Sequence, residues 1–123
     1  MFENDYILRE IHNLTRILGE VFFQKEFPTE EIIDEAGTLS ESGFLRYRLK
    51  ALLYEKKINE AENLLFETLT QSPTAENLQT ALIFYKDLQA MSDGALAECN
   101  FSKEEIAAGL RDVRRLYERD DKQ

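Results

Sequence analysis

The sequence predicts an all-α protein, folded as a small helical bundle with a helical hairpin in its middle. Apolar residues recur every three or four positions in several stretches, which is the pattern of helices that bury one side. Only five Gly and two Pro interrupt 123 residues, and 43% of the residues are hydrophobic. A chain of this length forms one domain around one core. We therefore expect residues 1–123 to form a single all-helical domain.

The first helix is expected at about residues 4–24, with Asn4 as its N-cap. Its apolar residues alternate four and three positions apart and form one broad stripe. We interpret this stripe as a candidate protein interface, through which a second copy would form a homodimer. In the alternative, the last two helices cover the stripe within one chain. The candidate interface residues are Ile7, Ile11, Leu14, Leu18, Val21 and Phe22.

An acidic link is expected at about residues 25–42, where the apolar periodicity ends. Its carboxylates lack the alternating spacing and the central glycine that a calcium-binding loop requires. We interpret the segment as a solvated connection and not as a metal site. The six carboxylates are Glu26, Glu30, Glu31, Asp34, Glu35 and Glu41.

The helical hairpin is expected at about residues 44–71. Leu49 points inward from its first helix, and Ala61 and Leu65 point inward from its second. Asn59, with Glu62 three residues later, gives a capping signal at the start of the second helix. Small Ala61 near the turn would let the two helix backbones approach each other.

This hairpin resembles a single tetratricopeptide unit. In that family a small residue lies early in the second helix, a large apolar residue follows four positions later, and a proline ends the unit. Ala61, Leu65 and Pro73 match the pattern, whereas bulky Leu49 replaces the small residue of the first helix. No second copy follows about 34 residues away, so the sequence does not predict a solenoid.

Two further helices are expected at about residues 73–90 and 102–119. Ser72 and Pro73 suggest the cap and the first position of the earlier one. Ser102, with Glu105 three residues later, is a full capping box for the later one. Gly109 keeps one patch of the last helix thin, which would allow another helix to approach closely.

A whole-chain resemblance rests on three segments: residues 5–9 (DYILR), 57–63 (KINEAEN) and 101–106 (FSKEEI). Together they resemble an uncharacterised bacterial family of short helical proteins, a domain of unknown function in Gram-positive anaerobes. The resemblance spans most of the chain and implies a helical fold and a bacterial origin. It implies no activity.

The residues that could carry catalysis are isolated. His12 is the only imidazole, and helical geometry places it beside Arg9 and Arg16 instead of a carboxylate. Cys99 is the only thiol, and one Cys with one His makes an incomplete zinc site. The sequence contains no glycine-rich phosphate loop. We therefore expect no catalytic, metal or cofactor-binding residues and no enzyme activity.

Charge and cysteine content indicate the compartment and the class of partner. The net charge of −9 disfavours nucleic acid and anionic lipid as partners, although residues 44–57 carry five basic residues and one acidic residue. The most apolar run, residues 21–23, is far too short to span a bilayer. A single Cys fits a reducing compartment. We therefore expect a cytoplasmic protein that does not enter a membrane.

The sequence thus favours a non-catalytic protein-protein interaction module that binds a protein partner or itself. The alternative is a nucleic-acid-binding helix-turn-helix in residues 95–117, with Arg111, Arg114 and Arg115 on its second helix. Leu96 departs from that motif, because a small residue normally occupies its place. The three arginines also lie late in the helix, whereas base contacts come from its start.

Overall fold

The computed structural model describes the backbone of residues 2–24 and 41–121, and the side chains of residues 5–20 and 43–118 within these ranges. These ranges contain six helices and no strand, which confirms the all-α prediction. The expected acidic link lies almost entirely outside the described residues. In chain order the helices are α1 (Phe2–Gln24), α2 (Glu41–Tyr54), α3 (Ile58–Gln71), α4 (Ala75–Gln89), α5 (Asp93–Glu98) and α6 (Lys103–Asp121).

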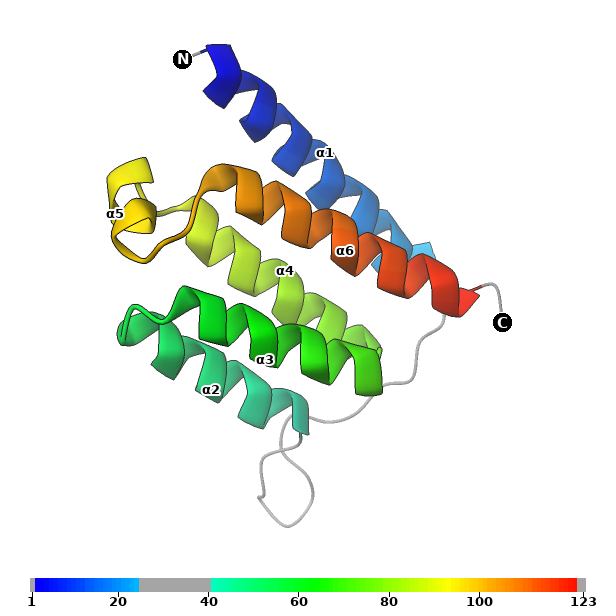
Figure 1. Ribbon diagram of the computed structural model, residues 1–123. Coiled ribbons are helices and arrows are strands. Elements are labelled where there is room, and N and C mark those ends of the chain that lie inside the picture. The colour runs from blue at the N-terminus through cyan, green and yellow to red at the C-terminus, as the bar shows by residue number, and fades with distance from the viewer. Residues whose placement is uncertain (1, 25–40, 122–123) are drawn as a thin grey trace.

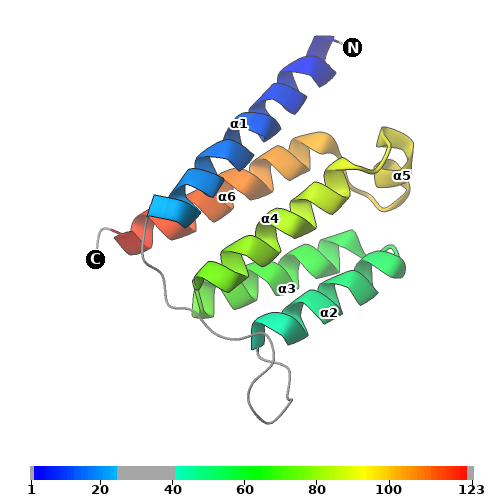
Figure 2. The same cartoon turned by 180° about the vertical axis from the view of Figure 1, so that it is seen from behind.

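The five longer helices form a two-layered stack (Figure 1). Helices α2, α4 and α1 lie side by side in one layer, and α3 and α6 form the other, as the view from behind in Figure 2 also shows. Contacts run in a zigzag from α2 to α3, then to α4, α6 and α1. The short α5 lies at one end, between α4 and α6. In this stack α2 and α1 are the two outermost helices.

One continuous core fills the space between the layers. Every long helix contributes, because each has apolar residues at helical spacing on its inward side. Tyr85 and Tyr117 are the largest fully buried side chains, and the Tyr117 hydroxyl donates to the carbonyl of Thr74 at 2.7 Å. Other fully buried residues are Ile11, Leu18, Ile58, Ala61, Leu65, Leu69, Leu78, Leu88, Leu96, Ile106 and Leu110.

The turns after α2 and after α5 share one C-terminal cap geometry. After α2, Lys56 has a φ of 64°, and the N–H of Lys57 donates to the carbonyl of Leu52 at 2.9 Å. After α5, Asn100 has a φ of 58°, and the N–H of Phe101 donates to the carbonyl of Leu96 at 3.0 Å. This is the Schellman arrangement, in which a left-handed residue ends the helix.

Three of the expected N-caps differ in the structure. α1 begins at Phe2, so Asn4 lies inside the helix. α4 is capped by Thr74, whose side chain accepts from the N–H of Asn77, and not by Ser72. Ser72 instead ends α3, and its carbonyl accepts from the Asn77 side chain at 2.7 Å. Proline therefore lies in the linker and not at the first helical position.

The expected cap at Asn59 is also replaced by longer-range contacts. α3 begins at Ile58, and the Asn59 side chain donates to the carbonyl of Asn100 at 3.2 Å. This bond joins the turn after α2 to the turn after α5. Glu62, the expected partner in that cap, accepts from the Tyr85 hydroxyl of α4. Local capping signals were therefore overridden by partners that only the folded chain brings near.

The capping box of the last helix lies where the sequence predicts it. The N–H of Glu105 donates to the Ser102 hydroxyl at 3.2 Å, and that hydroxyl lies 3.3 Å from a Glu105 carboxylate oxygen. The thin patch of the same helix is also present. A side chain at Gly109 would overlap the Tyr85 hydroxyl, so glycine lets α6 approach α4 at this point.

Candidate functional site

Exposed aromatic residues are concentrated on α2. Five large apolar side chains are exposed among the described residues, and three of them belong to this helix. Phe44 is 52% exposed, Tyr47 66% and Tyr54 90%. The spacing of 3.6 residues per turn places them on one side of the helix together with the exposed Arg48, Lys50 and Ala51, and we call this side the outer face of α2. An aromatic cluster of this kind on a water-exposed helix marks a candidate binding surface.

The outer face exists because α2 has apolar residues on two opposite sides. Leu45 and Leu49 are buried against the stack. The spacing of 3.6 residues per turn turns Phe44, Tyr47 and Tyr54 away from them. Since α2 is an outermost helix, its inward side meets α3 and α4, and no other described helix covers the outward side (Figure 1).

Positive charge flanks the middle of the outer face, whereas Glu55 follows Tyr54 at one end and pairs with Lys57 at 3.4 Å. Arg48 and Lys50 are both exposed and lie on opposite flanks of the outer face. The Arg48 guanidinium carbon lies 6.0 Å from the centre of the Phe44 ring, at the limit of a cation–π contact. The outer face is therefore aromatic and basic on a chain whose net charge is −9.

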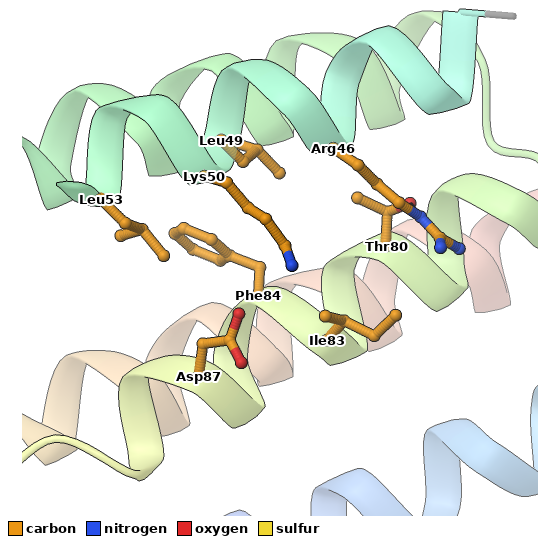
Figure 3. A pocket seen from close by; sticks show the side chains of 8 residues that line it. All are labelled: Arg46, Leu49, Lys50, Leu53, Thr80, Ile83, Phe84 and Asp87. Atoms are coloured by element: carbon orange, nitrogen blue, oxygen red, sulfur yellow. Dashed lines mark hydrogen bonds between the residues drawn. The ribbon is translucent and has the colours of Figure 1, made fainter. Parts of the chain in front are cut away.

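A groove between α2 and α4 adjoins the outer face (Figure 3). It is open to solvent, and its space, the part that is continuous with solvent included, is about 400 Å³. The Arg46 side chain crosses to α4, where it donates to Thr80 at 2.8 Å and to Gln79 at 3.1 Å. Figure 3 shows Lys50 extending over the groove and Asp87 rising from α4 on the same side. Apolar side chains line the remainder: Leu49, Leu53, Ile83 and Phe84.

The shape and lining of this groove suit the binding of a second molecule. The groove contains no His, Cys or Ser, and its polar side chains are Arg46, Lys50, Thr80 and Asp87. Across the described ranges, no three His, Cys, Asp or Glu residues approach closely enough to hold a metal ion. An apolar surface with flanking cations instead fits an apolar ligand that also carries negative charge.

The two isolated candidates for catalysis lie elsewhere. His12 is exposed on α1, beside a second groove that α1 forms with α4 and that Lys86 lines. Cys99 is buried at the end of α5. Lys103, at the start of α6, donates to the carbonyls of Gln89 at 2.8 Å and Met91 at 3.1 Å. Neither residue is part of the surface around α2.

Comparison with known proteins shows the family. A family model described as a family of unknown function (DUF6483) matches residues 1–118. The chain belongs to the DUF6483 family. No curated protein and no solved structure matches the chain. Membership confirms the resemblance to an uncharacterised helical family, and the matched range includes all of α2 and its outer face.

In this DUF6483 chain the stripe on α1 is largely covered within one chain. Ile11, Leu14 and Leu18 are buried in the core, where α1 packs mainly on α6, and Ile7 is partly buried against it. The side chains of Val21 and Phe22 lie outside the described residues. The three buried residues cannot meet a partner unless α1 separates from α6, because their apolar surface is already covered.

The segment that resembled a helix-turn-helix is built into the stack. α6 contacts α1, α3 and α4, and the exposed residues at its start are Glu104 and Glu105. These carboxylates would face DNA phosphates. The three arginines that the motif would use each form an ion pair with a nearby acid: Arg111 with Glu10, Arg114 with Glu118, and Arg115 with Asp112. The geometry therefore does not favour DNA binding through residues 95–117.

The sequence reasoning missed the outer face of α2, although a signal was present. Phe44, Tyr47, Ala51 and Tyr54 follow one another at intervals of three, four and three residues. This second stripe runs along the side of α2 opposite to Leu45 and Leu49. Two stripes on one helix indicate two partners, of which the described chain supplies only the inner one.

No described helix is long and apolar enough to cross a membrane.

Proposed function

We propose that this DUF6483 protein is a non-catalytic protein-binding module and that the outer face of α2 is its docking surface. The observation that carries the proposal is the exposure of Phe44, Tyr47 and Tyr54 side by side on an outermost helix. Tyr, Phe and Arg are enriched at protein interfaces, because a few large rigid side chains supply most of the binding energy. Burying one such side chain contributes about 1.5–3 kcal/mol.

The neighbouring groove supports the same function. It lies beside Lys50, between the outer face and α4, so a bound segment could contact the outer face and place a side chain in the groove. Hydrogen bonds to Thr80 and Gln79 already order the Arg46 side chain. This side chain therefore loses less conformational entropy when a partner binds to it. A shaped groove beside aromatic anchors is the arrangement by which helical proteins bind polypeptide segments.

Site-specific cross-linking tests the docking surface. A photo-reactive phenylalanine analogue would replace Tyr47 in one full-length variant and Tyr6 in another, and both would be expressed in the native cell. Tyr6 is a matched control because it is 70% exposed, against 66% for Tyr47, but lies on α1. We expect a discrete cross-linked protein from position 47 only, lost when Tyr54→Ala is added. Equal products from both positions, or none from position 47, would contradict the proposal.

A second measurement addresses the nucleic-acid alternative. The purified chain would be titrated with random duplex DNA at several salt concentrations. We expect no binding even at low salt, because the net charge is −9 and the start of α6 is acidic. Binding that weakens steeply as salt rises would instead support phosphate contacts and would favour the helix-turn-helix function.

A further inference from the structure

The outer face of α2 has the register of one half of a helix–helix seam. From this we infer that the partner segment is an acidic amphipathic helix lying along α2. The inference rests on the proposed function and adds the chemistry of the partner. Three features support it: the spacing of the apolar residues, the charges beside them and the place of α2 in the stack.

The apolar residues of the outer face follow the spacing of paired helices. Phe44, Tyr47, Ala51 and Tyr54 occupy successive positions of a three-and-four repeat, in which every residue points to the same side. They span about 15 Å along the helix axis, at 1.5 Å per residue. Ala51 leaves a low point between Tyr47 and Tyr54. A helix crossing there could come close to the α2 backbone and pack between the two rings.

The charges beside this stripe determine which charge a partner helix must carry. Arg48 directly follows Tyr47 and Lys50 directly precedes Ala51, so they occupy the two flanking positions of the repeat, and both are exposed. In paired helices the residues at these positions face the flanks of the partner and decide which helices associate. A second α2 in the same place would bring cations against cations. An acidic helix would pair with both flanks, so we assign the surface to a different polypeptide and not to a second copy.

The position of α2 in the fold favours a helix over an extended segment. The described residues contain no strand and hence no sheet edge to which an extended chain could add. α2 also ends the zigzag stack, in which each inner helix is packed on both sides (Figure 1). α2 has a groove on each side: the groove toward α4 described above, and a second one toward α3 that Phe44, Arg48 and Leu64 line. An added helix would fit between these grooves and continue the stack.

Two synthetic peptides test, with the full chain, whether the partner helix must be acidic. Both carry leucines at the three-and-four spacing over 21 residues, one with glutamate flanks and the other with lysine flanks. Each bears a fluorophore, and binding is followed by fluorescence anisotropy. We expect the glutamate peptide to bind at least tenfold more tightly, with an affinity that falls as salt is added, since exposed charge pairs are screened. Equal binding of both peptides, or no binding of either, would overturn the inference.

Charge reversal in the protein provides the matched variants. Arg48→Glu combined with Lys50→Glu should reverse the preference, so that the lysine peptide binds more tightly than the glutamate peptide. Tyr47→Ala should lower the affinity for the glutamate peptide about tenfold. Lys86→Glu is the control, because it reverses an exposed cation on α4 away from the outer face. Circular dichroism should show every variant as helical as the parent. If Lys86→Glu changed the preference between the peptides as much as the double variant does, net charge would be the cause and the inference would be wrong.

The two proposals can fail separately. If position 47 cross-links to a protein through a segment that is neither acidic nor helical, the docking surface stands and the acidic helix is wrong. If position 47 gives no cross-link, the docking surface itself fails. If light scattering shows a dimer that Lys50→Glu strengthens and Tyr47→Ala dissociates, the occupant is a second copy, which contradicts this assignment.

Discussion

The hydroxyl of Tyr85 on α4 lies 2.6 Å from a carboxylate oxygen of Glu62 on α3 and donates a hydrogen bond to it. Gly109 of α6 lies against the same hydroxyl, so three helices meet at this pair. Burial raises the pKa of both groups, and the nearby carboxylate of Asp112 adds to the shift in each. The pair therefore joins α3 to α4 at the place where α6 packs against both.

Replacing Gly109 with alanine should destabilise the chain. Alanine is the better helix former by about 1 kcal/mol, but its methyl group would overlap the Tyr85 hydroxyl. We expect a net loss of about 1–3 kcal/mol in the free energy of unfolding, measured by urea denaturation. Gly94→Ala is the control, because nothing lies within 4 Å of a side chain there. Equal effects at the two glycines would show that α6 and α4 do not approach closely.

Glu62→Gln should change how stability depends on pH. Burial is the main cause that raises the pKa of Glu62 above its ordinary value of 4.5, although the bond from Tyr85 lowers it. The unfolded chain thus releases this proton at lower pH than the folded chain. The contribution of protonated Glu62 to the free energy of unfolding is therefore fully present below about pH 4.5. It is lost as the pH rises through the pKa of the folded state.

The glutamine variant keeps the bond to Tyr85 but cannot ionise. We expect its stability relative to the parent to increase between pH 4 and pH 7, as measured by urea denaturation at both values. Glu67→Gln on the exposed side of α3 is the control, and its difference from the parent should not change in this way. A constant difference for Glu62→Gln would mean that the carboxylate is not held in a desolvated place.

Thr74→Ala should cost about 1 kcal/mol through loss of the cap of α4. The Thr74 carbonyl that accepts from Tyr117 is retained in this variant, so the loss reports the hydroxyl. Thermal unfolding followed by circular dichroism measures the effect. Ser72→Ala should change stability by less. If Ser72→Ala were the costlier change, α4 would begin at proline, as the sequence pattern suggested.

Lys56→Gly should stabilise the hairpin by about 0.5–1 kcal/mol. Lys56 has a φ of 64°, a conformation that costs a side-chain-bearing residue energy and glycine almost none. The gain is partly offset because glycine makes the unfolded chain more flexible. Lys57→Gly, at a φ of −103°, should bring no gain. Chemical denaturation of both variants tests this, and destabilisation by Lys56→Gly would contradict the left-handed cap.

Leu14→Glu should unfold the chain instead of separating a dimer. Leu14 is buried where α1 packs into the stack, and a carboxylate there costs several kcal/mol. Leu8→Glu on the same helix is the control, because Leu8 is 39% exposed and should tolerate the change. Circular dichroism and light scattering would be measured together. A Leu14→Glu chain that stays helical while its mass falls from dimer to monomer would restore the interface predicted from the sequence.

The sequence by itself determined the helices and several of their ends. Helical periodicity is a local property, so the α-helical class followed from it, and so did the inward sides of α2 and α3 at Leu49 and Leu65. The capping box of Ser102 and Glu105 was also visible, because both partners lie within one turn.

Only the tertiary structure decided which apolar stripe is covered. The stripe of α1 and the stripe of α2 both have helical spacing, yet Leu14 is buried on a helix that packs mainly on α6, whereas Tyr47 faces solvent. The Asn59–Asn100 and Glu62–Tyr85 bonds likewise join residues 41 and 23 positions apart. Periodicity shows that a helix has an apolar side, but the partner of that side is set by long-range packing, which local spacing does not encode.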